Sequence, residues 1–221
     1  MTIIEAIEVR HAVRSFTEQK IEGQTEETLC RAIDDVNKES GLHFQLCTDE
    51  PEAFQASKPH YGNFENCRNY IAAVAQNGSD EKIGYYGEKL VLIAQTLGLN
   101  SCWVVLTYKK GKAAYTCADG EKLRCVIDLG YGKTQGVQHK SKEIGKLCNI
   151  SGEEPKWFLS GMKAALLAPT AVNQQRFFFT REGNTVSAKA LSSIMGNTEL
   201  DLGIVKYHFE LGAGVDNFKW A

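Results

Sequence analysis

Four cationic side chains stand in two short clusters that could hold an anion. The first cluster is RHAVR, residues 10–14, and the second is HKSK, residues 139–142. Arginine offers a planar fork of N–H donors and lysine a compact point charge, and the two together suit a phosphate group. Lys140 and Lys142 point the same way if the chain there is extended. Taken alone, each cluster is better explained as a solvated or structural run.

The apolar segment before the first cluster sharpens the question. If the helix that this segment favours continued through the arginines, Ile3, Ile7, Arg10 and Arg14 would share one face. That core-facing stripe would end in two like charges, whose burial is costly without an anion. Nearby glutamates offer the alternative of ordinary surface pairing.

A polar run between two apolar segments, APTAVNQQRF at 168–177, predicts a different kind of site. Pro169 must end any helix that precedes it. Thr170, Asn173 and Gln175 follow as neutral hydrogen-bonding groups, and an amide both donates and accepts, which suits an imide or a polyol. The alternative is that Thr170 and Asn173 only satisfy the backbone of a turn.

Other chemistries find no support in the residue pattern. There is no G-x-S-x-G motif, no cysteine with a histidine partner by pattern, and no metal-ligand spacing among the histidines. We therefore predict no metal site and name no catalytic acid, base or nucleophile, and we assign His208 a structural role. The absence of G-x-G-x-x-G after a strand and of a Walker loop disfavours the Rossmann and P-loop folds.

Composition narrows the class of protein further. The 221 residues are 43% hydrophobic, enough for one domain or two small ones, and the net charge of −2 predicts neither a nucleic-acid nor a membrane partner. Glu5 and Glu8 interrupt the first apolar stretch and argue against a signal peptide. The seven cysteines lack a CxxC pair and sit mostly among apolar residues, which favours reduced thiols and a cytoplasmic location.

Hydrophobic patterning predicts the elements that must position these residues. Helices are expected over 25–38, 83–97, 157–167 and 202–213, with Asp201 as a cap, and strands over 43–48, 70–75, 103–107, 123–129, 177–180 and 184–188. This order predicts an α+β fold with a mixed or antiparallel sheet. Residues 86–103 and 202–220 also share an early glycine and a final tryptophan, a weak sign of internal duplication.

Four motifs together resemble the nitroreductase-like FMN-dependent oxidoreductases. RHAVRSF resembles the family's R-R-S-V-R-x-F, LGYG followed by HKSK resembles G-Y-P followed by two basic residues, and APTAVNQQRF resembles A-P-S-x-x-N-x-Q-P-W. GYYGEKLVLIAQTLGLNSCWV resembles the central helix that ends in G-L-x-x-C-W. The resemblance implies the nitroreductase-like α+β fold, a mixed or antiparallel sheet flanked by helices.

The resemblance also implies a set of residues that bind FMN without a covalent bond. Arg10, Lys140 and Lys142 would hold the phosphate with help from His11, and Arg14 would lie near the ribityl chain or the pyrimidine edge. The resemblance also implies that the backbone amides of Tyr86 and Gly87 face flavin N5 and O4, and that Tyr61 and Gly62 lie at the pyrimidine edge. The other side of the site would be closed by Pro169, Thr170, Ala171 and Asn173.

The implied activity is ping-pong transfer of hydride from NAD(P)H through flavin N5 to a nitroaromatic, a quinone or a related acceptor. Two departures from the family pattern matter. Ala12 replaces a serine, and the Q-P-W ending reads Gln175-Arg176-Phe177. These departures keep open the alternative of a non-enzymatic flavin-binding or sensor domain.

The order of the motifs predicts an unusual organisation. The polar motif comes about 155 residues after the arginines, whereas in ordinary members, which are homodimers, it follows shortly after them. We interpret residues 1–138 and 139–221 as two degenerate, fused halves that form a pseudo-dimer. The chain would then act as a monomer that binds one FMN.

Overall fold

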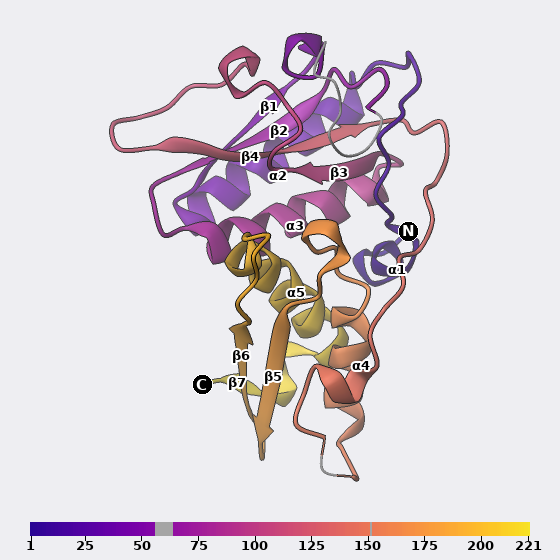
Figure 1. Ribbon diagram of the computed structural model, residues 1–221. Helices are drawn as coiled ribbons and strands as arrows, with labels where there is room; N and C mark the ends of the chain where they lie inside the picture. Colours follow the sequence, from indigo (N-terminus) through magenta and orange to yellow (C-terminus); the bar gives the residue numbers. More distant parts are fainter. Residues whose placement is uncertain (56–63, 151) are drawn as a thin grey trace. The chain divides into compact units, whose positions relative to one another are not determined.

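The computed structural model describes residues 1–55, 64–150 and 152–221, and the described chain separates into two compact units (Figure 1). Unit 1 comprises residues 1–79 and 89–137, and unit 2 comprises residues 80–88 and 138–221. The segment 80–88, which the sequence interpretation assigned to the first half, therefore groups with the second unit.

Unit 1 is built on a four-stranded antiparallel sheet in the order β1-β2-β4-β3 (Figure 1). Its strands are β1 (His43–Cys47), β2 (Tyr70–Ala75), β3 (Asn100–Val104) and β4 (Lys122–Gly130). Its helices are α1 (Ile3–Val9), α2 (Gln24–Ser40) and the 3-10 turns Pro51–Ala53 and Lys110–Lys112, together with the second half of α3 (Asp80–Thr96).

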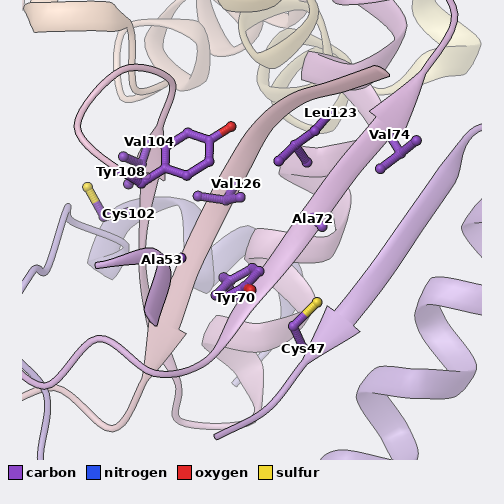
Figure 2. Close-up of a cluster of buried hydrophobic side chains, with 10 residues drawn as sticks. All are labelled: Cys47, Ala53, Tyr70, Ala72, Val74, Cys102, Val104, Tyr108, Leu123 and Val126. Atoms are coloured by element: carbon purple, nitrogen blue, oxygen red, sulfur yellow. The ribbon is translucent and has the colours of Figure 1, made fainter. Parts of the chain in front are cut away.

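The centre of this sheet is apolar because β2 and most of β4 are buried along their length. Paired residues of neighbouring strands point to the same face, so Tyr70, Cys102 and Val126 meet on one side of the sheet. Figure 2 shows this cluster, which Ala53 and Tyr108 join from outside the sheet. The core therefore fixes β3 and β4, and with them the segments that pair with β3.

Unit 2 combines helices with a second, smaller sheet in the order β5-β6-β7 (Figure 1). Its elements are the first turns of α3, the 3-10 turns Ile144–Lys146, Ala171–Asn173 and Val215–Asn217, α4 (Lys156–Ala165), β5 (Phe177–Glu182), β6 (Thr185–Ala190), α5 (Thr198–Ala213) and β7 (Lys219–Trp220). Strands β5 and β6 are antiparallel, and β6 and β7 are parallel. Phe158 of α4, Phe179 of β5 and Phe209 of α5 are buried, and their rings form the centre of this core.

The first turns of α3 and α5 approach each other backbone to backbone. A Cβ at Gly84 would lie 2.0 Å from the carbonyl oxygen of Leu200, and a Cβ at Gly203 would lie 1.8 Å from that of Glu81. Neither glycine can therefore accept a side chain without separating the helices. Gly203 is one of the two glycines whose spacing suggested a duplication in the sequence.

Most predicted elements are present within a few residues of their expected limits, and three local expectations were wrong. Strand β3 begins at Asn100 rather than at residue 103. Helix α5 begins at Thr198 after Asn197, so Asp201 lies inside the first turns and does not cap the helix. Helix α1 ends at Val9 and the backbone of Arg10 is extended, so Arg14 does not continue the helical stripe.

Candidate functional site

The arginine cluster lies on an extended segment beside β3 in unit 1. Arg10 caps the C-terminus of α1, where its amide N–H donates to the Ala6 carbonyl at 2.9 Å, and its side chain is buried. Beyond it, Ala12 forms a parallel bridge with Ser101, and the amide of Val13 donates to the Ser101 carbonyl at 3.0 Å. The segment is thus held to the sheet by main-chain bonds.

The charges of both arginines of this segment act on one thiol of β3, that of Cys102. Burial raises the pKa of Cys102 to about 11, while the charges of Arg14 and Arg10 and a hydrogen bond with Arg14 act in the opposite direction. Arg10 and Arg14 lie on an extended segment that pairs with β3 and not on one face of a helix.

His11 lies between the arginines and a close-packed turn. Gly136 has a φ of +69°, and a Cβ there would lie 2.8 Å from the Cβ of His11. Only glycine suits this conformation and this approach. Burial, followed by the charge of Arg10, lowers the pKa of His11 below its usual value, so the imidazole is neutral at pH 7.

In unit 2 the second basic cluster is joined to the polar motif. The ammonium group of Lys142 donates to the carbonyls of Gln174 and Gln175 at 2.8 and 2.9 Å, and the Lys142 amide donates to Gln175 Oε1 at 2.8 Å. Gln175 Nε2 donates in turn to the carbonyl of Lys140 at 2.9 Å. Two segments that the sequence separates by about 30 residues therefore form one assembly.

The side-chain amide of Asn173 is part of this assembly. Its Nδ2 donates to the carbonyl of Lys140 at 2.8 Å, and its Oδ1 accepts a bond from Gln175 Nε2 at 2.7 Å. The resemblance predicted that this amide serves the cofactor. In the structure both of its ends bind protein groups, so Asn173 also joins the two segments.

The polar motif has a strained backbone. Val172, Asn173 and Gln175 have φ values of +46°, +54° and +45°. Positive φ is tolerated by asparagine but is an outlier for a β-branched valine. Thr170 Oγ1 helps to hold this conformation by accepting the amide N–H of Gln175 at 3.0 Å. Strain of this kind persists only where the surroundings over-determine it, and it clusters at binding and catalytic sites.

Asp201 of α5 holds the same loop from beneath. Its Oδ1 accepts the amide N–H of Ala171 at 2.9 Å and its Oδ2 accepts Gln174 Nε2 at 2.7 Å, and its side chain is buried. Burial raises the pKa of Asp201 to about 6, although both hydrogen bonds lower it. Sequence reasoning considered Asp201 only as a helix cap, because nothing in the spacing links it to a loop about 30 residues earlier.

The prediction for Tyr86 and Gly87 needs correction, and the prediction for Tyr61 and Gly62 falls on residues that the structure does not describe. Tyr86 and Gly87 occupy the second turn of α3, where an α-helix pairs each amide N–H with the carbonyl four residues earlier. Their amides are therefore engaged and are not open donors for a flavin. Tyr61 and Gly62 lie outside the described residues. Pro169 follows the end of α4 at Ala165, as its chemistry requires.

Comparison with known proteins identifies the family. Residues 2–213 match the model of the family described as "Putative TM nitroreductase". The chain belongs to this nitroreductase family. No match was found among curated proteins.

Solved structures of nitroreductases share this fold. A nitroreductase from Thermotoga maritima is similar at a TM-score of 0.68 and 24% identity, over 99% of this chain and 87% of that one. A nitroreductase from Desulfovibrio desulfuricans, solved in complex with FMN, is similar at 0.52 and 16% identity, over 70% of this chain and 99% of that one. The α+β nitroreductase fold expected from the sequence is thus confirmed.

The donor set of this nitroreductase-family chain fits FMN. A flavin phosphate needs cations and N–H donors, and its ribityl chain and pyrimidine ring need neutral donors and acceptors. Lys142 has three donors, of which two reach the carbonyls named above, and Lys140 is exposed. Within the described ranges, no group of acidic, histidine and cysteine side chains could hold a metal ion, and no helix is long and apolar enough to span a membrane.

Proposed function

We propose that this chain is an FMN-dependent oxidoreductase that transfers hydride from NAD(P)H to a small acceptor such as a nitroaromatic or a quinone. Membership of a nitroreductase family supports an oxidoreductase. The observation that carries the assignment to this chain's own residues is the assembly of Lys142 with Gln174 and Gln175, because it unites a basic cluster with a strained polar loop. The FMN-bound relative from Desulfovibrio desulfuricans supports the choice of cofactor.

In this proposal the chain supplies binding and electrostatics. The chemistry supplied by bound FMN would be hydride transfer between NAD(P)H and the acceptor, by way of flavin N5. Arg10, Lys140 and Lys142 would neutralise the FMN phosphate, with His11 beside them. Arg14 would lie toward the ribityl chain or the pyrimidine edge. A cation there would stabilise the negative charge that develops on the flavin during reduction.

The neutral side of the proposed site is the loop that begins at Pro169. Thr170, Ala171 and Asn173 would face the flavin with main-chain and side-chain groups that the protein holds in a fixed, strained geometry. The amides of Tyr86 and Gly87 are paired within α3. Tyr86 would therefore act through its side chain, and Gly87 through the absence of one.

Anaerobic reduction tests this function. The purified protein should carry FMN or bind it when it is added, and NADH or NADPH should bleach the visible flavin absorbance in the absence of oxygen. Addition of a quinone or a nitroaromatic should then restore the absorbance. A chain that binds FMN but is not bleached by either nicotinamide would instead be a flavin-binding or sensor domain, the alternative that the Gln175-Arg176-Phe177 ending keeps open.

We also propose that the chain is a fused, degenerate version of a two-subunit nitroreductase that binds one FMN as a monomer. Support comes from the similar glycine-initiated stretches of α3 and α5 and from the close approach of these helices at Gly84 and Gly203. Flavin released by denaturation should amount to one molecule per chain. A ratio near two would overturn the fused-dimer interpretation while leaving the cofactor assignment intact.

A further inference from the structure

The loop of residues 168–176 cannot hold its own shape by local preference. Val172 adopts a positive φ of 46°, which is unfavourable for an L-residue with a branched side chain. Asn173 and Gln175 are also in the left-handed region. Groups outside the loop must therefore offset this cost, and they should be fixed more firmly than the loop itself.

Asp201 is the acidic group that meets this requirement. It belongs to α5, whose backbone lies against α3 at Gly203, so its main chain is anchored within unit 2. Its two carboxylate oxygens each accept one loop donor, the Ala171 amide at 2.9 Å and Gln174 Nε2 at 2.7 Å. Gln174 Nε2 also donates to the Gly196 carbonyl at 3.0 Å, which ties the loop to the segment before α5.

This arrangement requires an acceptor at both oxygens. An ionised carboxylate only accepts, so it satisfies both donors, whereas a protonated carboxyl or an asparagine amide presents a donor at one of the two positions. A donor facing a donor breaks one contact and leaves a buried polar group without its partner, which is unfavourable.

We propose that Asp201 is a positioning residue for the cofactor site: as a carboxylate it holds the Ala171–Gln174 turn in the strained conformation that binds flavin. The expected effect on flavin binding rests on the proposed FMN function, whereas the positioning of the loop rests only on the two hydrogen bonds. Asp201 touches the loop and not the cofactor, so its effect on binding is indirect.

The charges around Asp201 do not offer another explanation. Burial and the two neutral donors, the Ala171 amide and the Gln174 side chain, are the influences that set its pKa. Glu199, in the first turn of the same helix, is exposed and has the same favourable interaction with the helix dipole. Substitution of Glu199 therefore tests the interaction of a negative charge with the helix dipole alone, because among the described residues Glu199 makes no hydrogen bond with the loop. Substitution of Asp201 tests the loop contacts as well.

The first test uses the apoprotein and does not depend on flavin. Asp201→Asn and Glu199→Gln each remove one negative charge from the start of α5, and Gln174→Ala removes one partner from the loop side. Hydrogen exchange of a peptide spanning 169–176 should be faster in Asp201→Asn and Gln174→Ala than in wild type, with peptides from β5 unchanged. Glu199→Gln should match wild type. Equal loop protection in all four proteins would overturn the positioning role even if FMN binds normally.

The second test measures FMN affinity by quenching of flavin fluorescence over the range of about pH 5 to 8. Wild-type affinity should fall about tenfold as the pH falls through about 6, because protonation of Asp201 replaces one acceptor with a donor. Asp201→Asn should be weaker by a similar factor at pH 8 and should keep only the pH dependence that protonation of the FMN phosphate itself causes, whereas Glu199→Gln should retain the wild-type affinity and profile. A wild-type profile in Asp201→Asn would refute the proposal. A protein that binds no FMN but shows the exchange pattern would refute the proposed function alone.

Discussion

Glu88 and His208 form a hydrogen bond of 2.9 Å between Oε1 and Nε2, and both side chains are fully buried. The other ring nitrogen of His208, Nδ1, lies 3.1 Å from the carbonyl of Ala164. A carbonyl can only accept, so Nδ1 carries a hydrogen. One further proton must then lie between Nε2 and the carboxyl group, and the pair is neutral as a whole, whichever partner holds that proton.

Substitutions at Glu88 should separate hydrogen bonding from charge. Glu88→Gln can donate its amide N–H to Nε2 with the same histidine tautomer, so the loss in unfolding free energy should be small. Glu88→Leu leaves Nε2 buried without a partner and should cost about 1–3 kcal/mol more. Urea unfolding measures both variants. Glu81→Gln, which breaks the more exposed pair with Lys206, is the control and should cost about 1 kcal/mol or less. Equal losses for Gln and Leu would contradict the pairing.

Arg10 should contribute strongly to FMN affinity if it binds the phosphate. Removal of one charge-assisted hydrogen bond costs about 1.5–3 kcal/mol, which corresponds to a rise in Kd of about tenfold or more for Arg10→Ala. Because Arg10 is buried, circular dichroism must first establish that the variant is folded. Arg31→Ala, in the exposed part of α2, is the matched control and should leave Kd unchanged. An unaltered Kd in folded Arg10→Ala would remove Arg10 from the site.

Lys140 and Lys142 should differ in what they affect. Both variants to alanine should weaken FMN binding, and the loss should shrink as salt screens the phosphate interaction. Only Lys142→Ala also removes the bonds to the carbonyls of Gln174 and Gln175, so it alone should lower the Tm of the apoprotein. A Lys142→Ala loss of affinity that is independent of salt would show that this lysine acts by shaping the loop and not by charge.

Asn173→Ala should destabilise the apoprotein as well as the complex. The side chain makes hydrogen bonds to Lys140 and Gln175, and each typically contributes about 0.5–1.5 kcal/mol, with less where water can compete. Thermal unfolding without FMN should therefore show a lower Tm. Unchanged stability combined with weaker FMN binding would restore the expectation from the family motif, in which this amide serves the cofactor alone.

Asp128 should make the stability of the protein depend on pH. Burial raises the pKa of this carboxyl well above 3.8, and neither of its two buried oxygens has a hydrogen-bond partner within the described part of the chain. A folded pKa above the unfolded one gives stability that is fully present below about pH 4 and lost as the pH rises through the folded value. Relative to Asp128→Asn, wild type should therefore lose unfolding free energy steadily above about pH 4. Asp35→Asn, an exposed control, should follow wild type, and parallel curves for wild type and Asp128→Asn would contradict the assignment.

The sequence predicted the elements well where burial follows a simple period. Strand β2 is a continuous apolar run and was located at its observed limits, and α2 was extended by one residue at its start and two at its end. Pro169 and Gly41 marked helix ends through backbone chemistry alone. The fold class and the family followed from these elements and from the four motifs.

What sequence reasoning missed depends on contacts between distant residues. Asp201 meets Ala171 and Gln174, and His208 meets Glu88, 120 residues away, and no local period connects such pairs. The extended conformation after Val9 was also missed, because pairing with Ser101 of β3 overrides the helical pattern. In each case a tertiary contact decides the role of the residue.

The chain passes between the two units three times, after residues 79, 88 and 137, so unit 2 is not a contiguous stretch of the gene. A fragment that starts at residue 138 would lack the first turns of α3. It would leave the buried backbone face of α5 at Gly203 and the imidazole of His208 open to water. We therefore expect a polypeptide cut at this point to aggregate or be degraded unless both fragments are co-expressed. The units cannot be exchanged as separate modules by recombination.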